Sequence, residues 1–179
     1  AEIRENKRQK NKKMVITNCD DHFLYSSKFD TSDDFIKFID VGQADCALIY
    51  SNGYSALIDV GLPNTVNDVG DALSDCGIKT IDTVIISHLH SDHMGALPKL
   101  AEFFKIDNLI MPPIIDKSIS AAQRAKDITQ QKGGSVYEVV QGMNFNIGEF
   151  EITILSDFTD NSNENNRSIY VMAKIDDLK

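Results

Sequence analysis

Apolar residues in the first part of the chain come in short runs separated by small and polar residues, a pattern typical of β-strands. The runs at 35–41, 44–50 and 54–60 predict three strands, and Ser51-Asn52-Gly53 predicts a tight hairpin turn between the last two. Strands this close together along the chain are expected to lie side by side as a meander.

After the third strand, apolar residues recur at every third or fourth position, which predicts an amphipathic helix. The helix is marked by Val66, Val69, Leu73 and Cys76. Asn64 or Thr65 can cap its start, and Gly77 fits its end. Two further helices are predicted over 96–104 and 118–131.

Further strands alternate with these helices. They are predicted over 81–86, 109–111, 136–140, 150–155 and 169–175, and Gly142 and Gly148 are expected to bracket a turn. The run at 81–86 is apolar on both faces and is therefore expected in the centre of a sheet. Clustered strands followed by βα units, without a regular βαβ repeat, predict a layered α+β fold.

Length and charge indicate how the chain divides into a tail and a domain. The 179 residues fit one domain, and polar residues 1–33 predict a tail or adapter ahead of a domain at 34–179. Residues 1–13 contain six Lys or Arg against two glutamates, so this arm can contact nucleic acid or anionic lipid, although a solvated arm is the simpler interpretation. The net charge of −9 leaves an acidic body, which argues against a large phosphate-binding surface.

Cysteine usage and hydropathy leave the compartment open. Cys19, Cys46 and Cys76 form no close pair, and the last two lie in apolar patterns that predict burial. Unpaired cysteines favour a reducing cytoplasm, whereas an export signal trimmed from the N-terminus would place the protein outside it. No apolar run reaches the roughly 18 residues that a transmembrane helix needs.

The strongest chemical signal is the run Ser87-His88-Leu89-His90-Ser91-Asp92-His93. It holds three of the four histidines and follows the predicted strand at 81–86, so we expect it in the turn between that strand and the next helix. The fourth histidine, His22, stands alone among aspartates and is expected at the surface.

This run can hold metal. Side chains at i and i+2 of an extended segment point the same way, so His88 and His90 can face one ion. Asp92 and His93 follow the turn and are expected to face a second ion. Imidazole and carboxylate suit zinc, manganese or iron, and two ions about 3.5–4 Å apart can share a bridging hydroxide. The alternatives are a histidine-rich loop without metal and a structural zinc, which the divergence of Asp92 and His93 disfavours.

The run, followed by Met94-Gly95, resembles the HxHxDH motif of the metallo-β-lactamase superfamily. Residues 38–45, 57–61 and 165–168 also resemble one branch, the soluble hydrolase domain of competence-type DNA-uptake channels. The resemblance extends from about residue 35 to 179. It implies an αββα sandwich, of which this chain would be the N-terminal portion.

The resemblance also implies roles for individual residues. His88, His90, Asp92 and His93 would be metal ligands, and Asp92 would in addition handle a proton as a catalytic residue. Asp59 would hydrogen-bond a ligand imidazole and fix its tautomer, the alternative being a strand-end residue that caps backbone amides.

The superfamily completes its site with a Gly-Asp strand end and a later histidine, and neither follows residues 169–175. Asp157 is the nearby candidate for a substitute ligand, with loop capping as the alternative. We therefore expect this chain to be part of a longer hydrolase and to hold metal partly or not at all on its own. An exposed sheet edge can pair with a second copy.

The expected function is metal-dependent hydrolysis by a metal-bound hydroxide, with two zinc or manganese ions in the complete protein. Phosphoesters are the expected substrates, and the branch resemblance favours nucleic acid. The alternatives are hydrolysis of small esters, thioesters or β-lactams, and a non-catalytic fragment that binds a partner.

Overall fold

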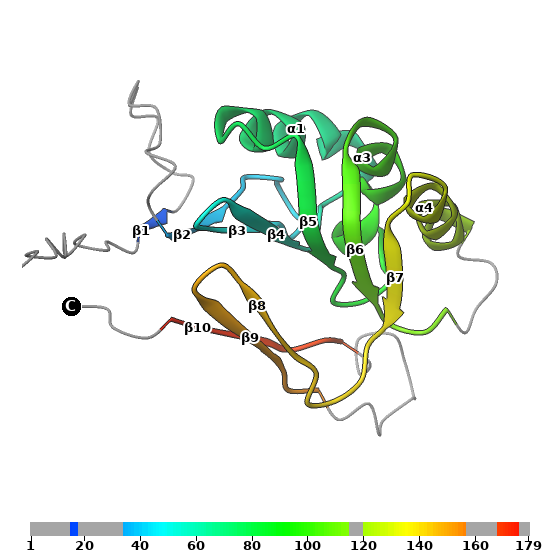
Figure 1. Ribbon diagram of the computed structural model, residues 1–179. Helices are drawn as coiled ribbons and strands as arrows, with labels where there is room; N and C mark the ends of the chain where they lie inside the picture. Colours follow the sequence, from blue (N-terminus) through cyan, green and yellow to red (C-terminus); the bar gives the residue numbers. More distant parts are fainter. Residues whose placement is uncertain (1–14, 18–33, 115–119, 157–167, 176–179) are drawn as a thin grey trace, which may run out of the picture.

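The computed structural model of this protein describes residues 15–17, 34–114, 120–156 and 168–175. Helices cover one face of a large β-sheet, and a smaller sheet packs against its other face (Figure 1). This helix–sheet–sheet layering confirms the α+β fold expected from the sequence.

The strands of the large sheet follow one another in chain order. They are β1 (Val15–Thr17), β2 (Phe35–Phe38), β3 (Ala47–Ser51), β4 (Tyr54–Ile58), β5 (Thr80–Ile85), β6 (Lys105–Met111) and β7 (Ser135–Glu138). β2, β3 and β4 form the predicted antiparallel meander, and Asn52 and Gly53 turn between β3 and β4 with φ angles of 50° and 89°. β4 to β7 run parallel, with helices in the connections.

β1 lies in the segment for which the sequence predicted a polar tail. Its three residues pair in parallel with the first three residues of β2. The rest of residues 1–33 lies outside the described residues, so the division into a tail and a domain stays a prediction.

The helices are α1 (Val66–Asp75), α2 (Ser91–Met94), α3 (Leu97–Phe103) and α4 (Ser120–Gln131), and a short 3-10 turn, η1 (Pro63–Thr65), precedes α1. Gly77 and Gly133 follow α1 and α4 with φ angles of 70° and 83°, the left-handed conformation that ends a helix. The predicted side-chain cap at Asn64 or Thr65 is wrong. Both residues belong to η1, and the Thr65 hydroxyl donates to the carbonyl of Leu62 instead.

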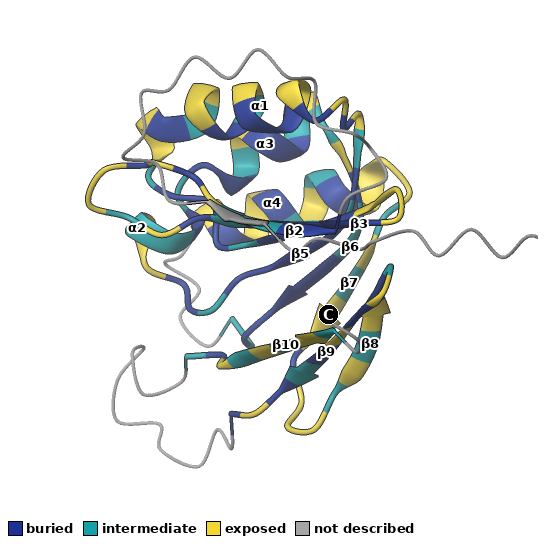
Figure 2. Ribbon diagram, turned by 90° about the vertical axis from the view of Figure 1, so that its left-hand side faces the viewer, coloured by how far each residue is buried: buried dark blue, intermediate teal, exposed yellow. Residues whose placement is uncertain are grey.

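Neighbouring residues of the large sheet enter two different cores. The core under the helices contains Leu48, Leu57, Val84 and Leu109. The core between the sheets contains Ile49, Ala56, Ile85 and Ile110. Because side chains alternate along a strand, both faces of β3 to β6 must be apolar, and these strands run through the buried middle of the molecule (Figure 2).

The smaller sheet consists of β8 (Asn144–Ile147), β9 (Phe150–Ile154) and β10 (Val171–Ile175), in the antiparallel order β10-β9-β8. The turn expected between Gly142 and Gly148 is wrong, because most of that segment is β8. Gly148 closes the β8–β9 hairpin with a φ of 56°, and a Cβ there would lie 2.3 Å from the carbonyl oxygen of Ser51. The Glu149 amide also donates to the Ser51 hydroxyl at 2.8 Å. These contacts join the hairpin to the first sheet.

Several further expectations can be compared with this fold. Cys46 and Cys76 are buried free thiols, as predicted, whereas Cys19 and Asp157 lie outside the described residues. Within the described part, β10 pairs with β9 alone, so pairing of its other edge with a second copy stays a prediction. None of the described helices is long and apolar enough to cross a membrane.

The carboxyl end of β5 is the place where both sheets and the helix layer meet. The chain leaves β5 at Ile85 and enters α2 six residues later. The Ile169 amide, just ahead of β10, donates to the Ser87 carbonyl oxygen at 2.8 Å. Figure 2 shows α2 at this edge of the molecule, on the same side as the segment that leads into β10.

Candidate metal centre

The histidine run follows a strand as predicted, but only residues 87–90 lie in the turn, because α2 (Ser91–Met94) includes its last three residues. It follows β5, and His90 has the extended backbone of a helix N-cap, with φ −73° and ψ 154°, directly before α2. His88 is 7% exposed and His90 is exposed, whereas Asp92 and His93 are partly buried. The four proposed ligands therefore lie on two elements, the turn and the first helical turn of α2.

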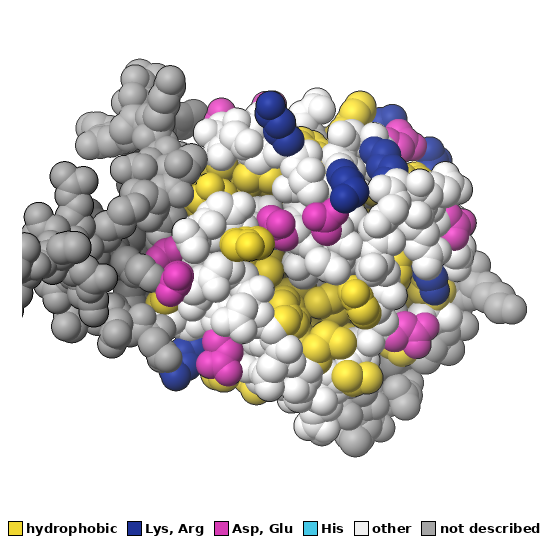
Figure 3. Space-filling view, viewed as in Figure 1, with side chains coloured by type: hydrophobic (Ala, Val, Ile, Leu, Met, Phe, Trp, Pro, Cys, Tyr) yellow, Lys and Arg dark blue, Asp and Glu magenta, His cyan; other side chains and the backbone are white. Residues whose placement is uncertain are grey.

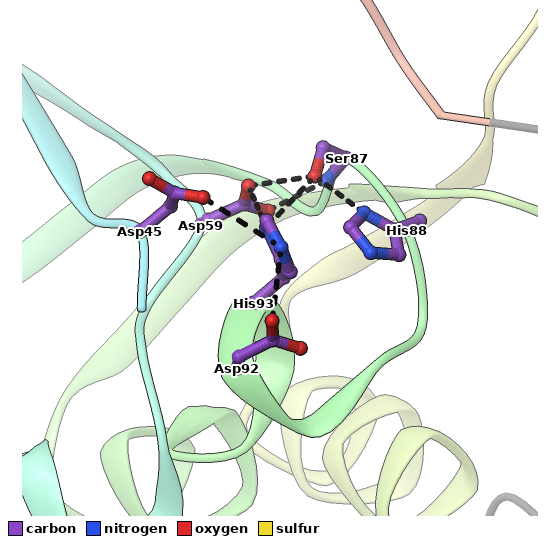
Figure 4. A network of polar contacts seen from close by, with 6 residues as sticks. All are labelled: Asp45, Asp59, Ser87, His88, Asp92 and His93. Atoms are coloured by element: carbon purple, nitrogen blue, oxygen red, sulfur yellow. Dashed lines mark hydrogen bonds and ion pairs between the residues drawn. The ribbon is translucent and has the colours of Figure 1, made fainter. Parts of the chain in front are cut away.

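Asp59 connects this turn to the neighbouring strand. It follows β4 with a positive φ of 56°, an uncommon conformation for a residue other than glycine. One carboxylate oxygen, Oδ1, accepts the Ser87 amide at 2.7 Å. The other, Oδ2, accepts the Ser87 hydroxyl at 2.6 Å and lies 2.8 Å from Nδ1 of His93 (Figure 4). Asp59 thus makes both contacts considered from the sequence, the bond to an imidazole and the cap on a backbone amide.

The contact with Asp59 determines how His93 presents its ring. A carboxylate accepts a hydrogen bond, so Nδ1 carries the proton and Nε2 keeps a lone pair for another partner. The pKa of His93 is raised, first by the hydrogen bond that it donates to Asp59 and then by the nearby negative charges, although partial burial opposes the rise. A metal ion at Nε2 would compete with a proton for that nitrogen.

His88 has the opposite electrostatic environment. Burial is the largest cause that lowers its pKa, and the neighbouring His93 and His90 add to it. Its Nδ1 lies 3.1 Å from the Ser87 hydroxyl. A buried, neutral imidazole is the form of histidine that binds metal ions.

The side chains of the four proposed ligands lie in a different grouping from the predicted pairs. The ring of His88 lies 3.8 Å from that of His93 and 4.8 Å from that of His90, measured between centroids. Ligand atoms of His88, Asp92 and His93 all lie within 4.8 Å of one another, while His90 is not a member of this group. The start of α2 brings His93 back beside the turn and next to His88, whereas the assignment of His88/His90 and Asp92/His93 to two separate ions stays a prediction. Two nitrogen donors and one carboxylate suit a divalent cation.

Sequence reasoning did not assign a role to Asp45, which also approaches the cluster. Its Oδ2 lies 3.6 Å from Nε2 of His93, and Oδ2 of Asp92 lies 3.5 Å from the same nitrogen (Figure 4). From the sequence, Asp45 was noted only as the last residue of the segment 38–45, which resembles the competence-type branch. Its proximity to His93 depends on tertiary contacts that no local pattern indicates.

A cavity of about 500 Å³ adjoins the cluster. It is lined by Phe38, Asp45, Cys46, Ala47, Ile58, Asp59, Ser87, His88, His93, Ser168, Ile169 and Tyr170. None of these lining residues is Lys or Arg, and two of them, Phe38 and Tyr170, are large aromatic residues that are 48% and 66% exposed. The cavity therefore combines polar groups at the histidine cluster with exposed aromatic rings.

A second cavity of about 300 Å³ is lined by both polar and apolar residues, the polar ones being Thr83, Asn108, Asn144 and Asn146. Its lining includes Ile110, Tyr137, Met143 and Phe145, and it has no histidine. Figure 3 shows hydrophobic side chains gathered across the middle of one face of the molecule, and no described histidine is visible there. The histidine cluster is therefore not exposed on that face.

Comparison with known proteins places these features in context. Residues 39–133, just over half of the chain, match the family model of the metallo-beta-lactamase superfamily. The chain is 33% identical over 76 residues to the anti-Pycsar protein Apyc1 of Bacillus phage vB_BsuM-Goe3, which covers 37% of this chain and 27% of that protein. It is 26% identical over 107 residues to the protein of the same name from Bacillus phage BSP38, covering 52% of this chain and 40% of that one.

Solved structures share the fold. A subclass B3 metallo-beta-lactamase from a soil metagenome library superimposes with a TM-score of 0.56 at 14% identity, over 79% of this chain and 55% of that enzyme. The chain thus spans about half of that enzyme and well under half of the curated relatives named above.

Proposed function

This chain belongs to the metallo-beta-lactamase superfamily, whose members are metal-dependent hydrolases, and we propose that its reaction is the hydrolysis of phosphoesters, with nucleotide phosphodiesters as substrates. The observation that carries the proposal is the cluster of His88, Asp92 and His93 at the edge of a cavity. The residues of this cluster fit a divalent metal.

The donor set supports that fit. His93 is oriented by Asp59 with Nε2 directed away from that carboxylate, and His88 is buried with a lowered pKa. We propose that His90 completes the set with His88, Asp92 and His93, binding zinc or manganese. A bound divalent ion would activate water and neutralise charge on the attacked phosphoryl group.

The residues of the chain have separate proposed roles in this reaction. Asp59 keeps the proton of His93 on Nδ1 and holds the turn through Ser87. Asp92, whose side chain is 48% exposed, is the proposed catalytic residue that takes up a proton from water and returns it to the leaving oxygen.

The walls of the cavity support a nucleotide as the substrate. About 500 Å³ is within the usual range for a small-molecule site and is too small for a nucleic-acid duplex. Phe38 and Tyr170 offer exposed rings on which a base can stack. The lining has no Lys or Arg, so charge neutralisation of a phosphate would depend on the metal.

The relatives suggest a biological setting. Curated relatives from two Bacillus phages are named anti-Pycsar proteins. We propose that the protein to which this sequence belongs acts in the same role, on cyclic or linear nucleotide phosphodiesters.

The proposal is tested with chelator-treated protein supplied with Mn²⁺ or Zn²⁺. The panel contains a cyclic mononucleotide, a linear dinucleotide, single-stranded DNA and a glycerophosphodiester, with His88→Ala as the inactive control. We expect metal-dependent hydrolysis of the nucleotides by the parent chain and none by the variant. Cleavage of a thioester or a β-lactam without cleavage of any phosphodiester would favour the alternative substrates. Cleavage of nothing, together with retained partner binding in His88→Ala, would favour a non-catalytic fragment.

A further inference from the structure

The loop between β2 and β3 brings a second carboxylate, in addition to that of Asp92, to the nitrogen of His93 that faces away from Asp59. Nε2 of His93 lies 3.6 Å from Oδ2 of Asp45 and 3.5 Å from Oδ2 of Asp92 (Figure 4). We infer that Asp45 is a further ligand of the metal centre, sharing a divalent cation with His93. This inference rests on the proposed metal centre and adds to it a residue from a different part of the chain.

The distances fit ligands of a common ion better than a direct hydrogen bond. Hydrogen bonds between nitrogen and a carboxylate oxygen are about 2.7–3.2 Å long. Donors that bind one ion at about 2.0–2.2 Å lie roughly 3.0–3.5 Å from one another in tetrahedral or octahedral geometry. The separations of 3.5 and 3.6 Å are close to that range, so Asp45 and Asp92 each lie near the position of a ligand that shares an ion with His93, although Asp45 is not part of the tighter group of His88, Asp92 and His93.

The backbone holds Asp45 at this position from two sides. Its amide donates to the carbonyl oxygen of Asp92 at 3.3 Å, and its own carbonyl accepts the amide of Gly61 at 3.0 Å. The amide of Val60 donates to the carbonyl of His93 at 2.8 Å. The loop that carries Asp45, the segment after Asp59 and the start of α2 are therefore hydrogen-bonded to one another.

Electrostatics give Asp45 a reason to bind a cation. Asp59 is satisfied by the amide and hydroxyl of Ser87 and by His93. Asp45 and Asp92 instead face one imidazole nitrogen, and the adjoining cavity has no Lys or Arg in its lining. Asp45, whose side chain is 74% exposed, and Asp92 place two negative charges beside Nε2 of His93, and a divalent cation bound at that nitrogen would be attracted by both.

A simpler role is an ion pair of Asp45 with protonated His93. Both roles place negative charge beside Nε2, but they predict opposite effects on metal binding. If Asp45 is a ligand, its loss weakens metal binding. If it only pairs with the imidazolium, its loss lowers the proton affinity of His93 and leaves metal binding equal or tighter.

The test is a Mn²⁺ titration of the chelator-treated chain, followed by calorimetry and by the spin-resonance signal of free Mn²⁺. Asp45→Asn keeps the size of the side chain and removes its charge. Asp45→Ser is a second variant, whose shorter side chain also cannot extend as far toward His93. Asp40→Asn is the matched control, because it removes one negative charge from the same loop. Oδ1 of Asp40 accepts a hydrogen bond from the Gly42 amide at 3.0 Å, and the side-chain oxygen of asparagine can still accept it.

We expect the dissociation constant to rise at least tenfold in Asp45→Asn and Asp45→Ser, and to stay within about twofold of the parent in Asp40→Asn. Equal binding by Asp45→Asn and the parent overturns the assignment of Asp45 and leaves the metal centre standing. Equal weakening in Asp40→Asn and Asp45→Asn also overturns it, because the effect is then one of net charge. Absence of Mn²⁺ binding by the parent up to millimolar concentration overturns both the assignment and the proposed centre.

Discussion

Oδ2 of Asp59 lies 2.8 Å from Nδ1 of His93, although the two residues are 34 positions apart in the sequence. This contact fixes the tautomer of His93, so that its other nitrogen faces Asp45 and Asp92. Asp59 follows β4 with a positive φ, and in this conformation its carboxylate lies beside the histidine run. Asp59, just after β4, therefore orients the proposed ligand His93 and holds the turn that carries His88.

Substitution of Asp59 tests this orientation. In Asp59→Asn the side chain keeps its shape, but an amide does not favour the Nδ1–H tautomer of His93 as a carboxylate does. We expect metal affinity and kcat/KM to fall by about 10- to 100-fold, measured by Mn²⁺ titration and by the phosphodiesterase assay. Asp82→Asn is the control, because Asp82 accepts the Ser55 amide from a neighbouring strand but does not contact the histidines. A similar loss of metal affinity in both variants would contradict the role of Asp59.

The two shifted histidines predict opposite pH dependences for the stability of the metal-free chain. The pKa of His93 is raised above 6.5, so the folded chain binds that proton more tightly and stability declines as pH rises above about 6.5. The pKa of His88 is lowered, so the unfolded chain binds its proton more tightly and stability declines as pH falls below about 6.5. Urea denaturation in the presence of a chelator, from pH 5 to 8, measures both.

Single variants separate these contributions. We expect His93→Gln to remove the decline above pH 6.5 and His88→Gln to remove the decline below it. An unchanged slope in His93→Gln above pH 6.5 would show that the hydrogen bond to Asp59 does not stabilise the protonated imidazole.

Gly95, which directly follows α2, lies where a side chain would not fit between α2 and η1. A Cβ at this position would lie 2.3 Å from the carbonyl oxygen of Ser91 and 2.4 Å from Cδ of Pro63, so Gly95→Ala forces α2 and η1 apart. We expect a loss of about 1–3 kcal/mol in the free energy of unfolding. Gly70→Ala is the matched control, since a Cβ there meets only a ring atom of Phe104 at 3.8 Å, and it should stabilise α1 by up to about 1 kcal/mol. Equal effects of the two variants on urea denaturation would rule out this packing account.

The exposed aromatic rings of the cavity predict selective recognition of nucleotides. We expect Phe38→Ala and Tyr170→Ala to raise KM for a nucleotide phosphodiester by about 5- to 150-fold, since stacking on a base contributes about 1–3 kcal/mol. KM for a glycerophosphodiester, which has no base, should change little. Phe103→Ala serves as the control, because Phe103 is also 66% exposed but does not line the cavity. A uniform rise in KM for both substrates would indicate general damage to the site.

Much of the fold could be predicted because its signals are local. The β2–β4 meander follows from short apolar runs and the Asn52-Gly53 turn, and the two-sided apolar strand β5 lies inside the sheet as expected. β8 was missed because only Phe145 and Ile147 are apolar in it, and it exists through pairing with β9 and packing on the first sheet. β1 was missed because its pairing with β2 links distant segments.

The candidate site was predictable to a similar extent. The histidine run and its place after β5 follow from residue types and spacing alone. Their grouping was not predictable, because the rule that i and i+2 point the same way applies to extended chain, and the chain bends into α2 after His90. The approach of Asp45 depends on backbone bonds to Asp92 and Gly61, which only the folded structure brings together.

The central claim is that the histidine run forms a divalent metal centre, and elemental analysis tests it most directly. The parent chain and a His88→Ala/His93→Ala variant are dialysed side by side against buffer containing Zn²⁺ at a fixed free concentration, and the bound metal is measured per chain. We predict bound zinc in the parent and its loss in the variant, with both chains folded by circular dichroism. Equal zinc content in the two chains, or none in the parent, would contradict the account.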